Sequence, residues 1–321
     1  MLVHLSFFLS VCLWISLASG RTKNPKRGIG YAGDVPGDII NANQSNSLIS
    51  WDYNWASIPP DYLATANISY IPMQWGSVGI DSFASDVQAQ GATAFNEPDF
   101  IDESNMEPAD AAKLWMQFLQ PLKSQGIRLG GPAVTASSTG VPWLQAFFAA
   151  CTNCTIDFLP LHWYGSGVDA FYNYIWSIHG QFPQYPIWIT EYAETSANQS
   201  VVMDFMNQTT VYMDGLSWIE RYAWFGYFVN MLTDDGALNA LGQLYTGAKT
   251  VHTENVTSGP TATYNTVNGA DNPTFAPAST FPAVFSSAVI SRESPLSLVV
   301  LFVTVVLAPI VIGISGILYA A

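Results

Sequence analysis

The stretch Ile156–Tyr192, IDFLPLHWYGSGVDAFYNYIWSIHGQFPQYPIWITEY, contains the pattern that decides the fold. Two β-prone apolar runs, Ile156–Tyr164 and Pro186–Tyr192, flank residues Val168–Ile178, which have helical character. Several residues in each run are apolar at consecutive positions, as is typical of strands that are covered on both faces. The stretch therefore predicts a strand, a helix and a second strand of a buried parallel sheet.

The same alternation continues on both sides of this stretch. Six further β-prone runs are Arg27–Tyr31, Leu48–Tyr53, Ile68–Trp75, Ala92–Asn96, Arg128–Pro132 and Arg221–Phe228. Amphipathic helices are predicted at Pro108–Ser124 and Ser200–Leu216, with a shorter one at Asp81–Gln90. In the first of these, Pro121 is expected to kink or fray the last turn, and Gly126 lies just past the end. Eight strands that alternate with helices in about 225 residues predict an α/β fold, a (β/α)8 TIM barrel, as a single domain over residues 26–250.

A doubly wound sheet is the alternative architecture for this alternation. Such a sheet needs a glycine-rich turn that binds phosphate directly after its first strand. The only glycine pattern of that kind, Gly28-Ile29-Gly30-Tyr31-Ala32-Gly33, lies inside the first predicted strand. The barrel is therefore favoured.

The two ends of the chain are apolar for different reasons. Residues 1–20 contain a short apolar run that ends in small residues, which is typical of a secretory signal peptide. Residues 251–294 are dominated by Thr, Ser, Pro, Gly, Ala and Asn, so we expect a disordered, O-glycosylated stalk. Residues 295–321 carry no charged side chain, and with the small residues around Ser286 they predict a glycosylphosphatidylinositol (GPI) attachment signal, with Ser286 as the attachment site. A transmembrane helix is the alternative for this tail.

Secretion is also the context that the sequons and cysteines favour. Asn-x-Ser/Thr sequons occur at Asn43, Asn67, Asn153, Asn198, Asn207 and Asn255, and each is a candidate N-glycosylation site. Cys151 and Cys154 are the only cysteines outside the signal peptide, and a local disulfide that closes a loop is expected between them. We predict a secreted monomer at the cell surface or in the cell wall, anchored to the plasma membrane by a lipid.

Composition excludes one broad class of partner. Only 11% of the residues are charged, and 24 acidic against 10 basic side chains leave a formal net charge of −14. Phosphate backbones repel a chain with this charge, so we expect no nucleic-acid partner.

Glutamates close two of the eight predicted strands. The fourth strand leads into Phe95-Asn96-Glu97-Pro98-Asp99, and the seventh ends in Trp188-Ile189-Thr190-Glu191-Tyr192. Active-site groups of TIM barrels come from the carboxyl ends of strands, so Glu97 and Glu191 are expected to share one site. Glycoside hydrolysis needs such a pair, because one carboxylic acid protonates the departing sugar oxygen while the other carboxylate meets the charge at the anomeric carbon.

Other strand ends supply candidate sugar contacts. Asn96 can hydrogen-bond a sugar 2-hydroxyl, and aromatic or imidazole rings can stack on sugar faces. The candidates from the third, sixth and eighth strands are Trp75, His162, Tyr164 and Trp224. No metal site is expected, because the histidines show no ligand spacing, and no cofactor motif is present. Asp34, Asp52 and Asp157 are expected to be cap or turn residues.

Five motifs in order carry a family resemblance. They are Lys26-Arg27-Gly28, Asn96-Glu97-Pro98-Asp99, Leu161-His162-Trp163-Tyr164-Gly165, Ile189-Thr190-Glu191-Tyr192 and Tyr222-Ala223-Trp224-Phe225. With them, residues 26–250 resemble glycoside hydrolase family 128, in particular its fungal group similar to the alkali-sensitive linkage protein. The Cys151–Cys154 pair before the sixth strand is part of the resemblance.

The resemblance implies a retaining (β/α)8 barrel that acts on β-1,3-glucan of the fungal cell wall. It implies that Glu97 is the acid/base, that Glu191 is the nucleophile, and that β-glucan is the partner. Endo action is the expected mode, while some relatives are exo-acting. The alternatives are a β-glucan-binding wall protein with little or no turnover, and a glucan transglycosylase that passes the sugar to a second glucan.

Overall fold

The computed structural model describes residues 22–33, 36–87, 91–227, 231–234 and 237–247. The predicted signal peptide (1–20), stalk (251–294) and C-terminal signal (295–321) lie outside the described residues, as do Asp34, Asn255 and Ser286. Within the described part of the chain, no helix has both the length and the apolar character needed to cross a membrane.

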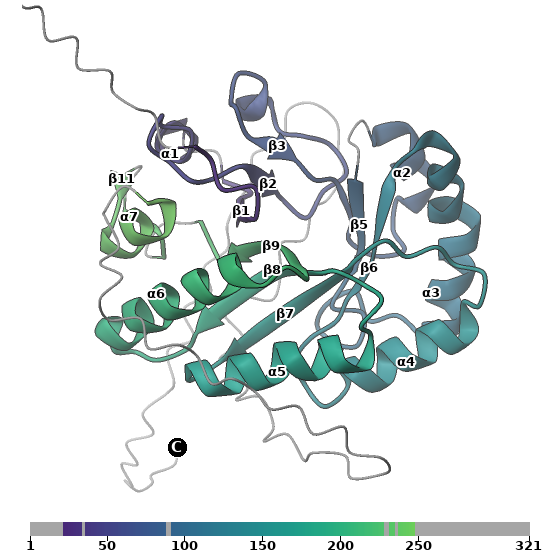
Figure 1. The fold of residues 1–321 in the computed structure, drawn as a ribbon. Helices are drawn as coiled ribbons and strands as arrows, with labels where there is room; N and C mark the ends of the chain where they lie inside the picture. Colours follow the sequence, from purple (N-terminus) through teal and green to yellow (C-terminus); the bar gives the residue numbers. More distant parts are fainter. Residues whose placement is uncertain (1–21, 34–35, 88–90, 228–230, 235–236, 248–321) are drawn as a thin grey trace, which may run out of the picture. The chain divides into compact units, whose positions relative to one another are not determined.

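Parallel strands and helices alternate along the described chain (Figure 1). The strands are β1 (Arg27–Gly30), β2 (Trp51–Tyr53), β3 (Ser69–Tyr70), β4 (Met73–Gln74), β5 (Gly91–Asn96), β6 (Arg128–Ala133), β7 (Leu159–Gly165), β8 (Ile187–Glu194) and β9 (Ile219–Trp224). The helices are α1 (Pro36–Ala42), α2 (Ile80–Asp86), α3 (Pro108–Leu114), α4 (Gly140–Ala150), α5 (Val168–Gln181), α6 (Gln199–Gly215) and α7 (Ala240–Thr246). A short antiparallel pair, β10 (Thr233–Asp234) and β11 (Ala237–Leu238), precedes α7.

The strand order is that of an eight-stranded barrel. One sheet has the order β3-β2-β1-β9-β8-β7, so the first strand pairs with the last, and a second sheet has the order β4-β5-β6. Parallel bridges at Gly130–Phe158 and Val134–Leu161 join β6 to β7. β3 and β4 are the two halves of the one strand predicted at Ile68–Trp75, divided at Ile71 and Pro72. The predicted parallel α/β fold is confirmed, and the order of its strands is the order that a TIM barrel requires.

Several element boundaries differ from the sequence prediction. The helix predicted at Pro108–Ser124 consists of α3, a π-helical turn (Trp115–Leu119) and a 3₁₀ segment (Gln120–Gln125), which accommodates Pro121 and ends at Gly126 with φ +80°. The eighth strand ends at Trp224 rather than Phe228. Helices α1, α4 and α7 were not predicted. In α7, packing overrides a glycine's weak helix propensity, because a Cβ on Gly242 would lie only 1.9 Å from the Leu232 carbonyl oxygen.

Large aromatic side chains fill part of the barrel interior and pack against small residues. Trp51, Phe158 and Trp188 belong to one buried cluster, and the rings of Phe158 and Trp188 stack with centroids 3.7 Å apart. A Cβ on Gly28 would lie 2.1 Å from the Trp51 ring, and one on Gly130 would lie 2.4 Å from the Phe158 ring. The glycine pattern at the start of the chain therefore serves barrel packing, which agrees with the preference for a barrel over a phosphate-binding sheet.

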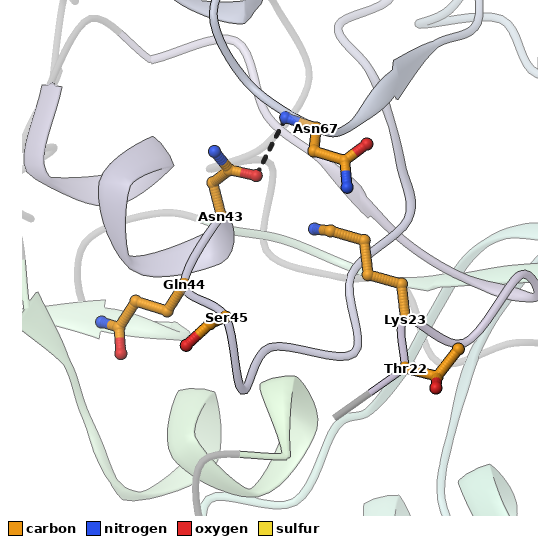
Figure 2. A pocket seen from close by; sticks show the side chains of 6 residues that line it. All are labelled: Thr22, Lys23, Asn43, Gln44, Ser45 and Asn67. Carbon is orange, nitrogen blue, oxygen red and sulfur yellow. Dashed lines mark hydrogen bonds between the residues drawn. The ribbon is translucent and has the colours of Figure 1, made fainter. Parts of the chain in front are cut away.

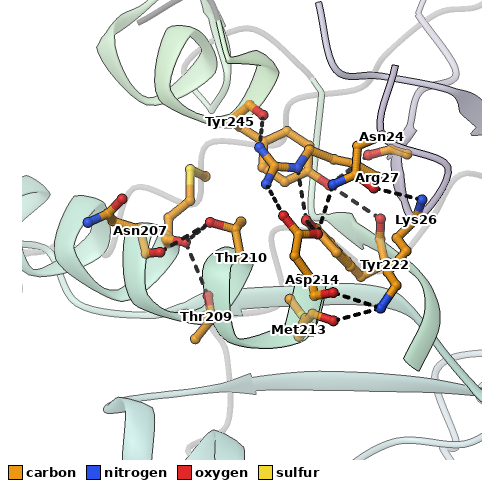
Figure 3. A network of polar contacts seen from close by, with 12 residues as sticks. Asn24, Lys26, Arg27, Asn207, Thr209, Thr210, Met213, Asp214, Tyr222 and Tyr245 are labelled. Carbon is orange, nitrogen blue, oxygen red and sulfur yellow. Dashed lines mark hydrogen bonds and ion pairs between the residues drawn. The ribbon is translucent and has the colours of Figure 1, made fainter. Parts of the chain in front are cut away.

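A polar network ties the first and last strands together at their amino-terminal ends (Figure 3). Buried Arg27 donates hydrogen bonds to the Tyr222 hydroxyl at 2.9 Å, the Tyr245 carbonyl oxygen at 2.8 Å and an Asp214 carboxylate oxygen at 3.2 Å. Lys26 Nζ donates to the carbonyl oxygens of Met213, Asp214 and Leu216, which are the orphan acceptors at the end of α6. The network joins β1, β9, α6 and α7 at the end of the barrel opposite the carboxyl ends of the strands.

Candidate active site

The carboxyl ends of β5, β7 and β8 bring Glu97, His162 and Glu191 together. One ligand atom from each of these residues lies within 4.8 Å of the other two. His162 and Glu191 are neighbours in the parallel register of β7 and β8, whereas Glu97 follows β5 on the other side of β6. Because parallel strands of a barrel end at the same rim, residues far apart in the sequence meet there.

An irregular strand end turns Glu97 toward this rim. Phe95 and Glu97 have φ values of +55° and +40°, a region that non-glycine residues seldom adopt. The register between β5 and β6 shifts twice before Asn96, and the Glu97 N–H donates to the Ala133 carbonyl oxygen at 2.8 Å. Such irregularities re-aim side chains at the end of a strand. Glu97 therefore contacts His162 while its neighbour Asn96 also faces polar partners.

Hydrogen-bond donors from other residues contact both carboxylate oxygens of Glu191. Trp55 Nε1 donates to Oε1 at 2.8 Å, and the Tyr53 hydroxyl donates to the same oxygen at 3.1 Å. The Tyr164 hydroxyl donates to Oε2, and His162 Nδ1 lies 3.4 Å from it. The side chain is only 7% exposed. Donors that converge on a buried carboxyl hold it in one orientation, as a nucleophile requires.

His162 lies between the two glutamates. Its Nδ1 is 2.8 Å from Glu97 Oε1, and the side chain is only 1% exposed. Burial lowers the pKa of His162, but the charge of Glu191 and the hydrogen bond and charge of Glu97 outweigh burial and raise this pKa to about 9. His162 thus acts as a positive partner shared by two acidic groups.

The environment of Glu97 favours a protonated carboxyl. Burial raises its pKa, His162 opposes the rise, and the charges of Glu191 and Asp99 add to it. The two glutamates thus have distinct settings, since Glu191 is surrounded by donors whereas Glu97 is next to other negative charges. One oxygen of each carboxyl group lies within 4.8 Å of one oxygen of the other, which is compatible with the separation of about 5–5.5 Å in retaining glycosidases.

A third glutamate, Glu103, reaches the same rim from the loop after β5. Its Oε2 accepts a hydrogen bond from Asn96 Nδ2 at 3.0 Å. Burial and the charges of Glu97 and Glu191 raise the pKa of Glu103 to about 7. Asn96 is only 4% exposed, so the predicted sugar contact is a buried amide that already has one acidic partner.

The remaining predicted contacts are divided between the rim and the core. Trp75 follows β4, is 38% exposed, and accepts a hydrogen bond from the Asn96 N–H at its carbonyl oxygen. Trp224 does not reach the site: it is 2% exposed and packs against Tyr192 and against Phe205 of α6. The expectation that Trp224 lines the cleft is wrong, because alternation along β9 turns its ring to the outer face.

Sequence analysis also missed four residues of the site. The next residue after Trp224, Phe225, has ring contacts with Trp55 and Tyr164. Tyr53 ends the second predicted strand, so the rule that selected the other strand ends would have found it. Trp55 and Glu103 lie in loops, and no sequence pattern distinguished them.

Two aspartates expected in caps or turns have different surroundings. Asp52 lies inside β2 and is 0% exposed, which contradicts the expectation. Asp157 accepts hydrogen bonds from the Leu129 N–H at 2.7 Å and from Lys123 Nζ, so it joins the loop before β7 to β6 and to the segment before it.

A pocket of about 450 Å³ has no glutamate in its lining (Figure 2). Thr22, Lys23, Asn43, Gln44, Ser45 and Asn67 line it, and the Asn67 N–H donates to Asn43 Oδ1 at 3.0 Å. Two predicted sequons therefore meet at this pocket. Among the others, Asn153 and Asn198 are exposed and Asn207 is half-buried in α6. A disulfide joins Cys151 and Cys154 directly after α4.

The expectation of no metal and no cofactor stays a prediction. Glu97, His162 and Glu191 are the one group of His, Cys, Asp and Glu residues in the described chain whose donor atoms could converge on a metal ion. Their direct contacts with one another account for the same closeness.

Comparison with known proteins identifies the family to which this fold belongs. Residues 28–245 match the family model described as "Glycosyl hydrolase catalytic core". Alkali-sensitive linkage protein 1 of Schizosaccharomyces pombe is 32% identical over 243 residues, which cover 68% of this chain but only 44% of that protein.

Two solved structures extend the comparison to three dimensions. A family 128 (subgroup III) curdlan-specific exo-β-1,3-glucanase from Blastomyces gilchristii, in complex with glucose, is 33% identical with a TM-score of 0.63, and the match covers 70% of this chain and 99% of that one. A family 128 (subgroup I) endo-β-1,3-glucanase from Amycolatopsis mediterranei, in complex with laminaritriose, is 29% identical with a TM-score of 0.59, covering 70% and 100%. The chain therefore belongs to the glycosyl hydrolase catalytic core family and, within it, to glycoside hydrolase family 128.

Proposed function

We propose that residues 26–250 form a retaining glycoside hydrolase that cleaves β-1,3-glucan, with Glu97 as acid/base and Glu191 as nucleophile. The observation that carries the proposal is the convergence of these two carboxyl groups, in different electrostatic settings, at one end of the barrel. The substrate class follows from the related glucanases, whose described substrates are β-1,3-glucans.

The first step forms a covalent intermediate. A carboxylate oxygen of Glu191 attacks the anomeric carbon, and the bond from that carbon to the glycosidic oxygen breaks. The proton of Glu97 passes to the departing oxygen, so the leaving sugar departs as a neutral alcohol. Tyr53 and Trp55 keep the Glu191 carboxylate aimed while charge leaves it.

The second step reverses these roles. Glu97, now ionised, takes a proton from water, and the water oxygen attacks the anomeric carbon as its bond to Glu191 breaks. Two inversions at one carbon give net retention. His162 contacts both carboxylates, so its positive charge offsets negative charge on whichever glutamate bears it.

Endo action is the mode we propose. The related enzymes differ in this respect, since one is described as exo-acting and another as endo-acting. An exposed aromatic ring at the rim, Trp75, can stack on a sugar unit beyond the cleavage point, which supports binding within a longer chain.

The cellular setting is also a proposal. We propose that the protein is secreted, N-glycosylated and held at the cell surface or cell wall by a GPI anchor at Ser286, where β-glucan is within reach. Release of the protein from intact cells by a phospholipase that cleaves GPI anchors supports this anchor. Retention after that treatment indicates a transmembrane tail.

The decisive experiment is product analysis on defined glucans. The purified protein is incubated with linear β-1,3-, β-1,4- and β-1,6-glucans, and NMR follows the anomeric configuration of the first product. We expect cleavage of the β-1,3-linked substrate alone, a β-configured first product and mixed internal fragments. An α-configured first product contradicts the nucleophilic role of Glu191, single glucose units contradict endo action, and products longer than the substrate indicate transglycosylation.

A further inference from the structure

The loop after β5 folds back on the strand from which it starts. The Phe100 N–H donates to the Glu97 carbonyl oxygen, and the Glu103 N–H donates in turn to that of Phe100. The Ser104 N–H then returns to the Asn96 carbonyl oxygen at 3.3 Å. Successive turns therefore bring Glu103, six positions beyond Glu97, to the strand end again.

The Asp99 side chain within the loop and the Trp143 side chain of α4 hold the loop in this form. The Asp99 carboxylate accepts hydrogen bonds from the Thr135 N–H at 3.0 Å and from the Thr139 hydroxyl at 2.9 Å, both after β6. Trp143 Nε1 of α4 donates to the Met106 carbonyl oxygen at 2.6 Å. The hydrogen bonds of the folded loop therefore fix where Glu103 lies.

When Glu103 is ionised, it can only accept in its hydrogen bond with Asn96. An ionised carboxylate has no proton to donate, so the amide must turn its Nδ2 group toward Glu103. The bond then uses one N–H of Asn96 and leaves the second for another acceptor. Asn96 directly precedes the acid/base, so the orientation of this amide determines what the site offers a sugar hydroxyl beside the bond that breaks.

The placement of Glu103 is electrostatically unfavourable. It is half-buried and feels the negative charges of both Glu97 and Glu191, while only His162 and the Asn96 hydrogen bond favour its ionised form. A neutral side chain at position 103 would relieve this repulsion. An interaction that costs stability at the edge of a site is expected where the group has a role in the reaction.

We propose that Glu103 is a positioning residue of the glycosidase reaction, a third carboxylate that fixes the amide of Asn96 for a sugar hydroxyl without itself reacting. The inference rests on the proposed function. It deepens that function by assigning a role to a residue outside the catalytic pair.

Kinetics of four variants of the full chain test the positioning role. E103A removes the acceptor, E103Q retains an oxygen that accepts from Asn96, N96A removes the amide, and E103A/N96A combines two losses. The matched control is D102N, which neutralises the adjacent exposed carboxylate of the same loop. The substrate is the linear β-1,3-linked glucose hexamer.

We expect E103A to lower kcat at least about tenfold with little change in KM, because a charge-assisted hydrogen bond is worth about 1.5–3 kcal/mol. E103Q is expected to lose less activity than E103A, because its neutral oxygen still accepts from Asn96, and D102N is expected to keep the wild-type activity. The double variant is expected to be no worse than N96A, because both changes remove the same contact. Wild-type kcat in E103A, or losses that multiply in the double variant, would overturn the proposal.

A second measurement does not depend on glucan cleavage. In NMR spectra, the two Nδ2 protons of Asn96 should shift in E103A and stay near their wild-type positions in E103Q. The pKa of His162, to which the charge of Glu103 contributes, should fall in both variants and stay unchanged in D102N. An Asn96 amide that is insensitive to E103A contradicts the proposal. If the wild type cleaves no β-1,3-glucan but the variants show these shifts, the result contradicts the proposed function and leaves the contact between Glu103 and Asn96 intact.

Discussion

His162 Nδ1 lies 2.8 Å from Glu97 Oε1, and this contact sets the balance of the proposed acid/base. Burial and neighbouring negative charges raise the pKa of Glu97, whereas the imidazole opposes that rise. A general acid works best when its pKa is close to the pH at which it operates. The net effect is a raised pKa of Glu97, which favours its protonated form, while the contact with His162 limits the rise.

Chemical rescue should distinguish the two glutamates. With an activated aryl β-glucoside of a β-1,3-linked dimer, E191A and E97A should both lose at least about 10²-fold in turnover of the enzyme. Azide should restore product formation in both variants, but with opposite configuration. In E191A azide attacks the anomeric carbon directly and gives an α-glycosyl azide, whereas in E97A it attacks the glycosyl-enzyme and gives a β-glycosyl azide. NMR of the azide products checks the assignment, and exchanged configurations would reverse the two roles.

Loss of His162 should move the pH dependence of the reaction. His162 lowers the pKa of Glu97, so H162Q should raise that pKa and move the alkaline limb of kcat/KM to higher pH. The maximum of kcat/KM should fall at least about tenfold, because the contact that holds Glu97 in place is lost. A pH profile from about 4 to 10 measures both effects. An alkaline limb that moves to lower pH contradicts the role of His162 as a positive partner.

Adding one methyl group to Gly28 should destabilise the barrel. The Cβ of G28A would lie 2.1 Å from the Trp51 ring, so the buried ring or β1 must move. Overpacking of this kind costs about 1–3 kcal/mol, which urea unfolding can measure. The matched control is G215A at the end of α6, where an added Cβ has no neighbour within 4 Å. Equal stability of the two variants contradicts the packing argument.

Replacement of Asp52 should stabilise the protein at neutral pH. Burial raises the pKa of Asp52 well above its usual value, and the backbone N–H groups of Tyr31 and Tyr53 lower it only in part. The folded state therefore retains a proton that the unfolded chain releases above pH about 4, so stability falls as pH rises from there toward the folded pKa.

D52N removes this proton linkage. Its melting temperature should exceed that of the wild type by a few degrees at pH 7–8, and the difference should shrink toward pH 4. D102N, in an exposed loop, serves as the control. A difference that grows as the pH falls has the wrong sign for a buried, protonated Asp52.

The local pattern was sufficient to locate the main catalytic candidates. Each follows a run of apolar residues, and the carboxyl ends of parallel strands meet at one rim whatever the loops between them do. For the same reason Tyr164 and His162 could be named from the sixth strand. These inferences need only the strand count and the direction of the chain.

Placement of single side chains was less predictable. Trp224 and Phe225 are adjacent aromatic residues at the end of the eighth strand, and alternation puts their rings on opposite faces. The register in which β9 pairs with β8 decides whether the ring of Trp224 or that of Phe225 points toward the site. That register contains shifts. The sequence does not encode the phase of such an alternation locally, so the prediction was wrong by one residue.

The sequence by itself indicated the barrel, its family and the two glutamates that we propose as catalytic, because apolar runs and strand-end residues are local features. Only the tertiary structure decided which side chains surround the site: the imidazole of His162 between the two glutamates, the indole of Trp55 on Glu191, and Glu103 beside Asn96. These contacts join positions separated by many residues or by a folded loop. Their distances depend on barrel closure and packing, and no short stretch of chain contains that information.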